Sequence, residues 1–442
     1  MSILLKGEEK MKKLISLILI VVTALSFATP AFAALTPEEQ EMMDAIDSHH
    51  DELHEIATKI WELKEVGWQE VESSKLLAAE FEALGFDVEL GLTGKHPTLG
   101  HDIDMPTAFK ATYKGLEGGP TIGILLEYDA LPNGHSCGHN LIATSGVAAA
   151  IALQEAFKKT PGTVIAYGTP AEELEGSKHF MVEAGYFDGV DLVLGSHSGD
   201  FWNTEVNGKA IVWPTHDNWL TFKGKASHAS AAPEKGRSAL DAVMLTAMAL
   251  EFTREHMPET NRIHYIISNG GAASNVVPDT ATLNLEIRAN ETSELNNLRK
   301  RVDDIIKGAE LMTGTTAVYQ WDAAWNTATQ VPSLYQKMAE YSVDLGVPYE
   351  KFVFGTKPSA SSDLGCVAYV IPTAEIKYPI HHEGEQPPAG HSDEKAAITA
   401  TEYAIDQSIL AGKIMALTGF RIGTNPEELA KIKAEFAENY SE

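Results

Sequence analysis

Cysteine is scarce in this chain, because only Cys137 and Cys366 occur among 442 residues. Two thiols are too few to hold a small fold together, so the chain is not a disulfide scaffold. A single disulfide between the two thiols remains open if the protein is exported. The chain also lacks low-complexity segments and internal repeats. Its length and its 44% hydrophobic content indicate a large buried core and two domains.

Positive charge is also in short supply. Lysine and arginine number 34 against 62 aspartates and glutamates, which gives a formal net charge of −28. The first 33 residues carry +2, from four lysines and two glutamates, so the rest of the chain is near −30. A surface of this sign repels nucleic acid and anionic lipid, and we expect neither as a partner.

The N-terminus has the pattern of a secretory signal peptide over residues 1–33. Lys12 and Lys13 precede an apolar run from Leu14 to Ala24, and Ala31-Phe32-Ala33 follows as a small-x-small cleavage pattern. The run is shorter than the ~20 apolar residues that a membrane span needs, although a retained membrane anchor is the alternative. We therefore expect export to the periplasm or the exterior after cleavage.

Beyond this segment, apolar runs and helical patterns alternate along the chain. Thr121–Leu126, Val164–Gly168 and Asp191–Gly195 are typical of buried strands. The alternation favours an α/β fold with a mixed, mostly parallel sheet and helices on both faces. It predicts a discontinuous main domain over residues 34–212 and 323–442. Its helices are expected at Thr36–Leu63, Glu70–Leu84, Leu141–Phe157, Ser177–Ala184 and Asn425–Tyr440.

The pattern changes between residues 213 and 322. The order of elements expected there is β-α-β-β-α-β, which is the ferredoxin-like order. We therefore predict a small α+β domain inserted into the larger one. Its strands are expected at Asn218–Phe222, His264–Ser268, Thr280–Ala289 and Thr316–Gln320, and its helices at Ser238–Arg254 and Glu294–Met312.

Three polar clusters follow predicted strands of the main domain. The carboxyl ends of parallel strands face one crevice, so these clusters are expected to converge. Thiolate, imidazole and carboxylate are the ligands that zinc and related metals take. The side chains concerned are those of Glu127, Asp129, Cys137, His139, Glu172, Glu173 and His197.

Two details of spacing favour a metal-activated water. Cys137 and His139 are two residues apart, so in extended backbone their side chains point the same way. One residue of the pair Glu172 and Glu173 can bind a metal. The other is then free to take a proton from a metal-bound water and pass it to a leaving nitrogen.

Each of these signals has a bland interpretation when taken alone. A Cys-x-His pair is more often structural, and paired glutamates usually mark a solvated helix start. A histidine after a strand is often only a hydrogen-bonded loop residue. Their occurrence at three successive strand ends favours an active site. The string Gly134-His135-Ser136-Cys137-Gly138 also matches a serine-hydrolase nucleophile elbow, although a polar loop separates it from the strand.

These residues resemble the motifs of the M20 metallopeptidase and amidohydrolase family. The resemblance covers nearly all of the chain after residue 33 and is closest to the B-type subunit of p-aminobenzoyl-glutamate hydrolase. The motifs are Asp129-Ala130-Leu131-Pro132, Cys137-Gly138-His139, Pro170-Ala171-Glu172-Glu173, Gly224 to Ala229, Asn275 to Asp279 with Arg288, Ser361-Ser362-Asp363 and Ala389-Gly390-His391-Ser392.

For the main domain, the resemblance implies a catalytic site with two divalent metal ions, Zn²⁺ or Mn²⁺. Glu172 would be the general base, and Asp129 would orient a metal ligand from outside the coordination sphere. His381 and His382 compete with His391 for the last ligand position, and the Gly-His-Ser setting favours His391. The implied ligands are Cys137, His139, Glu173, His197 and His391.

For the inserted domain, the resemblance implies a lid that also serves as a dimerisation module. His228 would stabilise the oxyanion, often in the active site of a second copy of the chain. Asn275 and Arg288 would hold the substrate, Arg288 through a carboxylate. The alternatives are a loop histidine, a turn cap before Pro278 and a surface charge, respectively.

Together these expectations describe an exported, homodimeric, metal-dependent C–N hydrolase. Its substrate would be an N-acyl amino acid or a dipeptide-like molecule, such as p-aminobenzoyl-glutamate. Asn140 stands where much of the aminoacylase branch has aspartate, which favours the p-aminobenzoyl-glutamate type. That type is generally cytoplasmic, so a signal peptide is unusual. The alternative is an exported, non-catalytic protein that binds a metal or a peptide, which would have no need of the unliganded Glu172.

Overall fold

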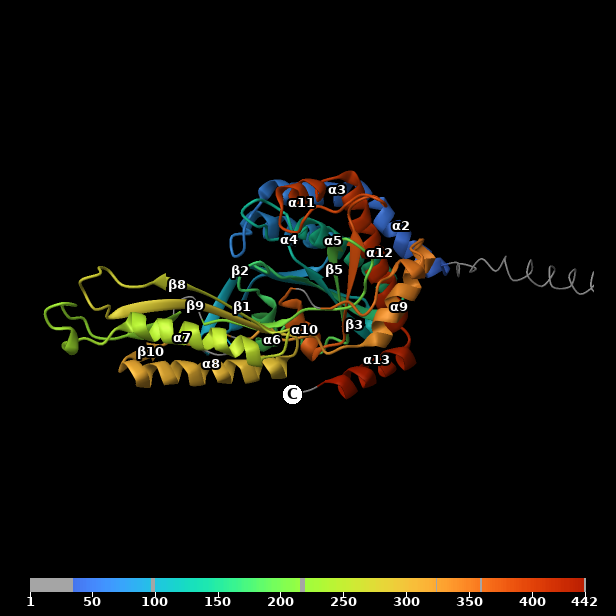
Figure 1. Cartoon of the computed structure of the whole chain (residues 1–442). Helices are drawn as coiled ribbons and strands as arrows, with labels where there is room; N and C mark the ends of the chain where they lie inside the picture. Colours follow the sequence, from blue (N-terminus) through green and yellow to red (C-terminus); the bar gives the residue numbers. More distant parts are fainter. Residues whose placement is uncertain (1–34, 97–99, 215–218, 323, 358–359, 441–442) are drawn as a thin grey trace, which may run out of the picture. The chain divides into compact units, whose positions relative to one another are not determined.

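The computed structural model describes residues 35–96, 100–214, 219–322, 324–357 and 360–440. The predicted signal peptide lies outside these residues, so its structure is not described. All elements below belong to one compact unit, Pro37–Glu442. Figure 1 shows their arrangement along the chain.

The main domain is built on a six-stranded sheet in the order β1-β2-β4-β3-β5-β11. The four strands β4, β3, β5 and β11 run parallel to one another, whereas β1 and β2 are antiparallel to their neighbours. The predicted mixed, mostly parallel sheet is thus confirmed. The strands are β1 Asp87–Lys95, β2 Asp102–Lys114, β3 Leu116–Leu126, β4 Pro161–Gly168, β5 Leu192–Gly199 and β11 Thr373–Pro379.

The central helix of the main domain is α5, His139–Phe157, which begins inside the predicted site. It packs against β3, β4 and β5 and, along its length, against α12, Glu402–Gly423. The helices approach closely at Gly412, where a Cβ would stand 2.7 Å from the Cβ of Ala148. Although α5 is long and apolar enough to cross a bilayer, 94% of its most apolar stretch is buried inside the protein. It is therefore a core helix that fixes its first residue, His139, in place.

Further helices surround this sheet (Figure 1). They are α2 Pro37–Ser48, α3 His50–Leu63, α4 Val71–Ala83, α6 Lys178–Glu183, α9 Pro332–Ser342, α10 Leu364–Val370, α11 Asp393–Ile398 and α13 Pro426–Asn439. Short 3-10 turns occur at Val343–Leu345 and Tyr349–Lys351.

The inserted domain has a second sheet whose strands follow the order β10-β7-β9-β6, with β8 paired to β9. Alternate residues of β9 are buried and pack with α7 and α8, as a half-buried strand should. The elements are β6 Ala210–Val212, β7 Leu220–Lys223, α7 Ala239–Thr253, β8 Arg262–Asn269, β9 Thr280–Ala289, α8 Thr292–Thr313 and β10 Thr316–Val318, with 3-10 turns at Pro233–Lys235 and Arg254–His256.

The structure differs from the sequence-based expectations at two places in particular. The single helix expected over Thr36–Leu63 is interrupted at His49 and forms α2 and α3. Strand β6 lies before residue 213, the expected start of the inserted domain, yet it pairs with β9 of that domain. Its three residues are too few to show a period in the sequence.

Candidate active site

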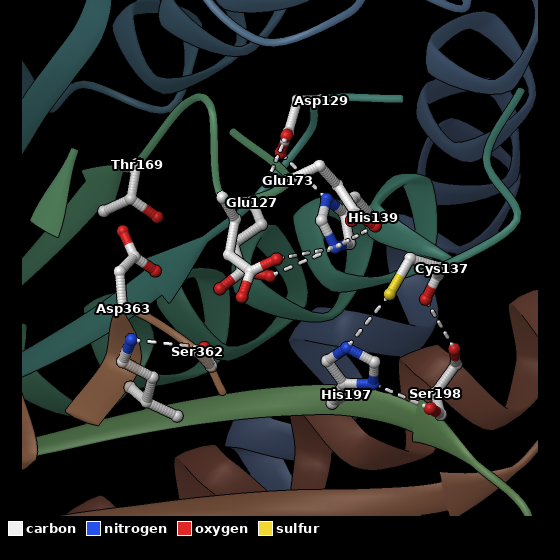
Figure 2. A network of polar contacts seen from close by, with 12 residues as sticks. Glu127, Asp129, Cys137, His139, Thr169, Glu173, His197, Ser198, Ser362 and Asp363 are labelled. Atoms are coloured by element: carbon white, nitrogen blue, oxygen red, sulfur yellow. Dashed lines mark hydrogen bonds and ion pairs between the residues drawn. The ribbon is translucent and has the colours of Figure 1, made fainter. Parts of the chain in front are cut away.

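The predicted clusters converge at the carboxyl ends of the parallel strands. Glu127 and Asp129 follow β3, and Glu172 and Glu173 follow β4. His197 lies within β5, two residues before its end, and not in a loop after it as expected. Figure 2 shows the side chains of Glu127, Asp129, Glu173 and His197 around one space, with the His139 ring between the carboxylates and the Cys137 sulfur. The topology of the sheet thus brings together residues that are far apart in the sequence.

Cys137 and His139 meet through a turn. Gly138 has φ 84° and precedes α5, so the backbone turns between the two residues and the expectation of extended backbone is wrong. A Cβ at Gly138 would stand 2.4 Å from Ser198 Oγ, so glycine is required both for its conformation and for space. The turn places Cys137 Sγ 3.5 Å from His197 Nε2, while His139 becomes the first residue of a buried helix.

Glu127, His139 and Glu172 form one group of potential ligand atoms. Two further groups overlap at Cys137: Cys137, His139 and His197 make the first, and Cys137, Glu173 and His391 make the second; within each group the atoms lie within 4.8 Å of one another. His391 Nε2 is 3.7 Å from Glu173 Oε1. The Cys137 sulfur belongs to both overlapping groups, which is the arrangement expected of a ligand shared by two cations.

The electrostatics of this cluster fit bound cations. Three buried atoms, Glu127 Oε2, His139 Nε2 and Glu173 Oε1, have no hydrogen-bond partner among the described residues. Burial raises the pKa of the Cys137 thiol to about 12, so it would ionise at neutral pH only beside a compensating positive charge. Sulfur, imidazole and carboxylate ligands together suit zinc. The imidazole and carboxylate ligands suit manganese equally well.

Asp129 acts on two members of the cluster. Its Oδ1 lies 2.8 Å from His139 Nδ1, and its Oδ2 accepts the backbone N–H of Glu173 at 2.9 Å. Burial alone would raise the pKa of Asp129, but His139 and the Glu173 N–H outweigh it and lower the pKa. The charged carboxylate thereby holds a proton on Nδ1 and leaves Nε2 facing the cluster.

Glu172 lies beside the cluster rather than in the two groups that share Cys137. Its Oε2 is 3.9 Å from His139 Nε2. Burial and the negative charge of Glu127 raise its pKa well above the usual range for glutamate. A carboxyl group whose pKa is raised and that faces a cluster of this kind is suited to general acid and base chemistry.

Behind the cluster lies a buried network of ion pairs that no pattern in the sequence indicates. Lys178 Nζ lies 2.8 Å from Glu127 Oε1 and 2.6 Å from Asp363 Oδ1, and Lys178 is fully buried. The network fixes one oxygen of Glu127 and leaves the other 3.5 Å from His139 Nε2. Asp363 belongs to the Ser361-Ser362-Asp363 motif. The sequence does not indicate that Lys178 is buried, because a lysine at a helix start is usually exposed.

The structure does not support a serine nucleophile, a disulfide or the two rival histidines. Ser136 donates its hydroxyl to Asn133 Oδ1 at 2.9 Å, where a serine nucleophile would bond a histidine base. Cys137 and Cys366 are both free thiols. Of the rivals to His391, His381 Nε2 lies 3.2 Å from the carbonyl oxygen of Asp200 and His382 packs on Tyr403; neither belongs to the groups described above.

Two cavities meet above the cluster. One, of ≈ 370 Å³, lies over Cys137 and His197. The other, of ≈ 590 Å³, extends from the same carboxylates to the inserted domain and is lined by Trp213, Trp325 and Arg288 among others. Glu172, Glu173 and His391 line both cavities, so a molecule in the larger one reaches the cluster.

The predicted residues of the inserted domain lie in different surroundings. Arg288 lines the larger cavity and forms an ion pair with Glu286 at 2.6 Å. His228 and Asn275 are exposed and line neither cavity. His228 Nδ1 accepts the backbone N–H groups of Ser230 and Ala231 at 3.3 and 3.2 Å, so its Nε2 carries the proton and can donate it.

Comparison with known proteins identifies the family. The peptidase dimerisation domain of the M20 family matches residues 216–311. The Xaa-Arg dipeptidase of Mus musculus is 32% identical over 424 residues, which cover 92% of this chain and 94% of that protein. The B-type subunit of the p-aminobenzoyl-glutamate hydrolase of Escherichia coli (strain K12) is 36% identical over 329 residues, or 69% of this chain and 65% of the relative.

Solved structures share the fold at lower identity. The aminobenzoyl-glutamate utilization protein from Klebsiella pneumoniae is 18% identical with a TM-score of 0.60, over 84% of this chain and 97% of that one. A dinuclear metal binding peptidase from Bacillus subtilis is 18% identical with a TM-score of 0.57, over 84% and 98%. The chain belongs to the M20 peptidase family. Within that family it is an amidohydrolase or peptidase.

Proposed function

We propose that this protein is an exported, metal-dependent amidohydrolase that cleaves the amide bond of an N-acyl amino acid or dipeptide-like substrate. The observation that carries the proposal is the convergence of Cys137, His139, Glu173, His197 and His391, with Glu172 beside them. Bound divalent cations would polarise the substrate carbonyl and lower the pKa of water from about 15.7 to about 7.

The residues of the chain supply the proton transfers and the orientation. Glu172 accepts a proton from the attacking water and returns it to the departing nitrogen, for which its raised pKa is suited. Asp129 holds His139 in one tautomer through the 2.8 Å contact with Nδ1. A non-catalytic binding protein would gain nothing from a second carboxyl group held 3.9 Å from His139 Nε2 beside the groups that share Cys137, so the geometry favours the hydrolase over the binding protein.

The larger cavity supports an acyl or aroyl amino acid as substrate. Trp213 and Trp325 form one wall, with ring centroids 5.4 Å apart, and Trp213 Nε1 has no hydrogen-bond partner among the described residues. An aromatic wall accepts a planar group, and Arg288 provides a cation for a substrate carboxylate. p-Aminobenzoyl-glutamate carries both features, and the name of the relative from Escherichia coli points to the same substrate.

We also propose that the protein acts as a homodimer through the inserted domain. Met244, Met248 and Phe252 form an exposed apolar stripe on α7, and Ile267 is exposed on the neighbouring strand β8. Exposed apolar residues gathered in this way mark a protein interface. A second copy bound there would explain why His228 and Asn275 stand exposed, because they would reach the site of the other chain.

Activity on a defined substrate panel tests the proposal. The panel consists of p-aminobenzoyl-glutamate, N-acyl amino acids and dipeptides with C-terminal arginine, assayed with added zinc or manganese and after chelation. We expect hydrolysis that a chelator abolishes and that the metal restores. Tight binding of these compounds without any turnover would instead establish the binding protein. Export is tested separately, by finding the mature chain outside the cytoplasm with its N-terminus at Ala34.

A further inference from the structure

A second cluster of metal-binding side chains lies on the surface of the main domain, apart from the residues of the active site. His50 Nε2 and His54 Nε2, both on α3, lie 3.2 and 2.8 Å from the same oxygen, Asp406 Oδ1, on α12. The three ligand atoms lie within 4.8 Å of one another. None of these residues belongs to the groups around Cys137.

The helix geometry accounts for the arrangement. His50 and His54 are four residues apart, so their side chains lie one above the other on one face of α3. Their ring centroids are 4.4 Å apart. Ligands of a tetrahedral zinc ion stand about 2.0–2.2 Å from the metal and hence about 3.3–3.5 Å from one another. The observed separations require only small side-chain movements to admit such an ion.

The surroundings of the cluster also suit a cation. The side chains of His50 and Asp406 are about half exposed, at 45% and 47%, so water can complete the coordination. Asp51 Oδ1 lies 3.5 Å from His50 Nδ1, where a carboxylate holds the proton and leaves Nε2 as the metal-binding nitrogen. The strong negative charge of the chain raises the local concentration of cations at its surface.

We infer that His50, His54 and Asp406 form an additional site for a transition-metal ion, of the zinc or nickel class. The ion would link two helices that are far apart in the sequence. α12 follows the segment that carries His391, and α3 contacts the loop before Cys137 through the 2.8 Å bond of His135 Nε2 to the Ile60 carbonyl. Metal bound between the two helices therefore braces the frame of the active site without touching substrate.

The number of zinc ions bound per chain tests this inference. Wild type, His54→Gln, Asp406→Asn and the control His49→Gln are titrated with Zn²⁺ and counted by native mass spectrometry. His49 is the neighbour of His50 but contacts the Ala45 carbonyl instead of Asp406. We expect the wild type and His49→Gln to bind one zinc ion more than His54→Gln and Asp406→Asn. An equal count in all four proteins would overturn the inference.

A stability measurement gives a second readout that does not depend on catalysis. Zinc that binds only the folded protein raises its melting temperature. We expect zinc to raise the melting temperature of the wild type and of His49→Gln more than that of Asp406→Asn. Equal shifts would contradict the brace between α3 and α12. Because each comparison is a difference between variants, it remains interpretable even if the cluster around Cys137 binds no metal.

Discussion

The main domain and the inserted domain differ in how completely one chain builds the candidate site. In the main domain, Asp129, His139 and Lys178 are buried, and each is held by a charged neighbour. In the inserted domain, His228 and Asn275 are exposed and line neither cavity, and the His228 ring contacts only Ser230 and Ala231 nearby. The main-domain half is therefore preorganised within one chain, whereas our dimer proposal assigns the exposed residues of the inserted domain to a contact with a second copy.

The largest expected effect comes from the preorganised half. Glu172→Gln keeps the shape of the side chain but removes its proton-accepting oxygen, so kcat should fall by about 10²–10⁴-fold. The metal content should stay at the wild-type value if the cations bind the two groups that share Cys137, because Glu172 belongs only to the group with Glu127 and His139. The control is Glu183→Gln, an exposed carboxylate on α6. Wild-type activity in Glu172→Gln would remove Glu172 from the mechanism.

The free energy of unfolding should depend much more on the buried ion pairs of Lys178 than on an exposed ion pair. Lys178→Met leaves Glu127 and Asp363 buried without their cation, which costs about 3–5 kcal/mol of unfolding free energy. Lys75→Met breaks an exposed pair with Glu72 and costs about 0–1 kcal/mol. Denaturant unfolding of the two variants gives the comparison directly. Equal losses would show that the Lys178 network does not support the site.

On the inserted-domain side, Arg288→Ala should impair binding more than chemistry. Loss of a charged hydrogen bond of about 1.5–3 kcal/mol corresponds to a KM raised about 10- to 100-fold for a substrate with a carboxylate. Arg254→Ala, which removes an exposed pair with Glu251 on the same domain, is the control. Steady-state kinetics on p-aminobenzoyl-glutamate measures this effect. A KM equal to that of the control would show that Arg288 does not bind the substrate carboxylate.

The smallest effect expected within a single chain comes from a substitution in the proposed dimer interface. Phe252→Glu puts a charge on the exposed stripe of α7, and sedimentation should then show monomers. Activity should fall with dissociation, because His228 would no longer reach a second site. Leu116→Glu is a comparable change at an exposed apolar residue of β3, and it should leave the dimer intact. A Phe252→Glu variant that stays dimeric would place the interface elsewhere.

The sequence was informative where a residue type and a strand end coincide. The sheet, the central helix and the meeting of Cys137, His139, Glu173 and His197 follow from apolar runs and from parallel topology. It was less informative where tertiary packing decides. The turn at Gly138 replaces the expected extended backbone, and Lys178 is buried only because Asp363, 185 residues away, lies against it. His391 required the family resemblance, since no strand pattern marks its loop.

The most direct test is a crystal of the protein grown with zinc or manganese and measured at the absorption edge of the metal. Besides any zinc at His50, His54 and Asp406, we predict two anomalous peaks that share Cys137, each about 2.0–2.3 Å from its protein ligands. One peak should contact His139 and His197, the other Glu173 and His391. An anomalous map without density among these side chains at saturating metal would contradict this prediction.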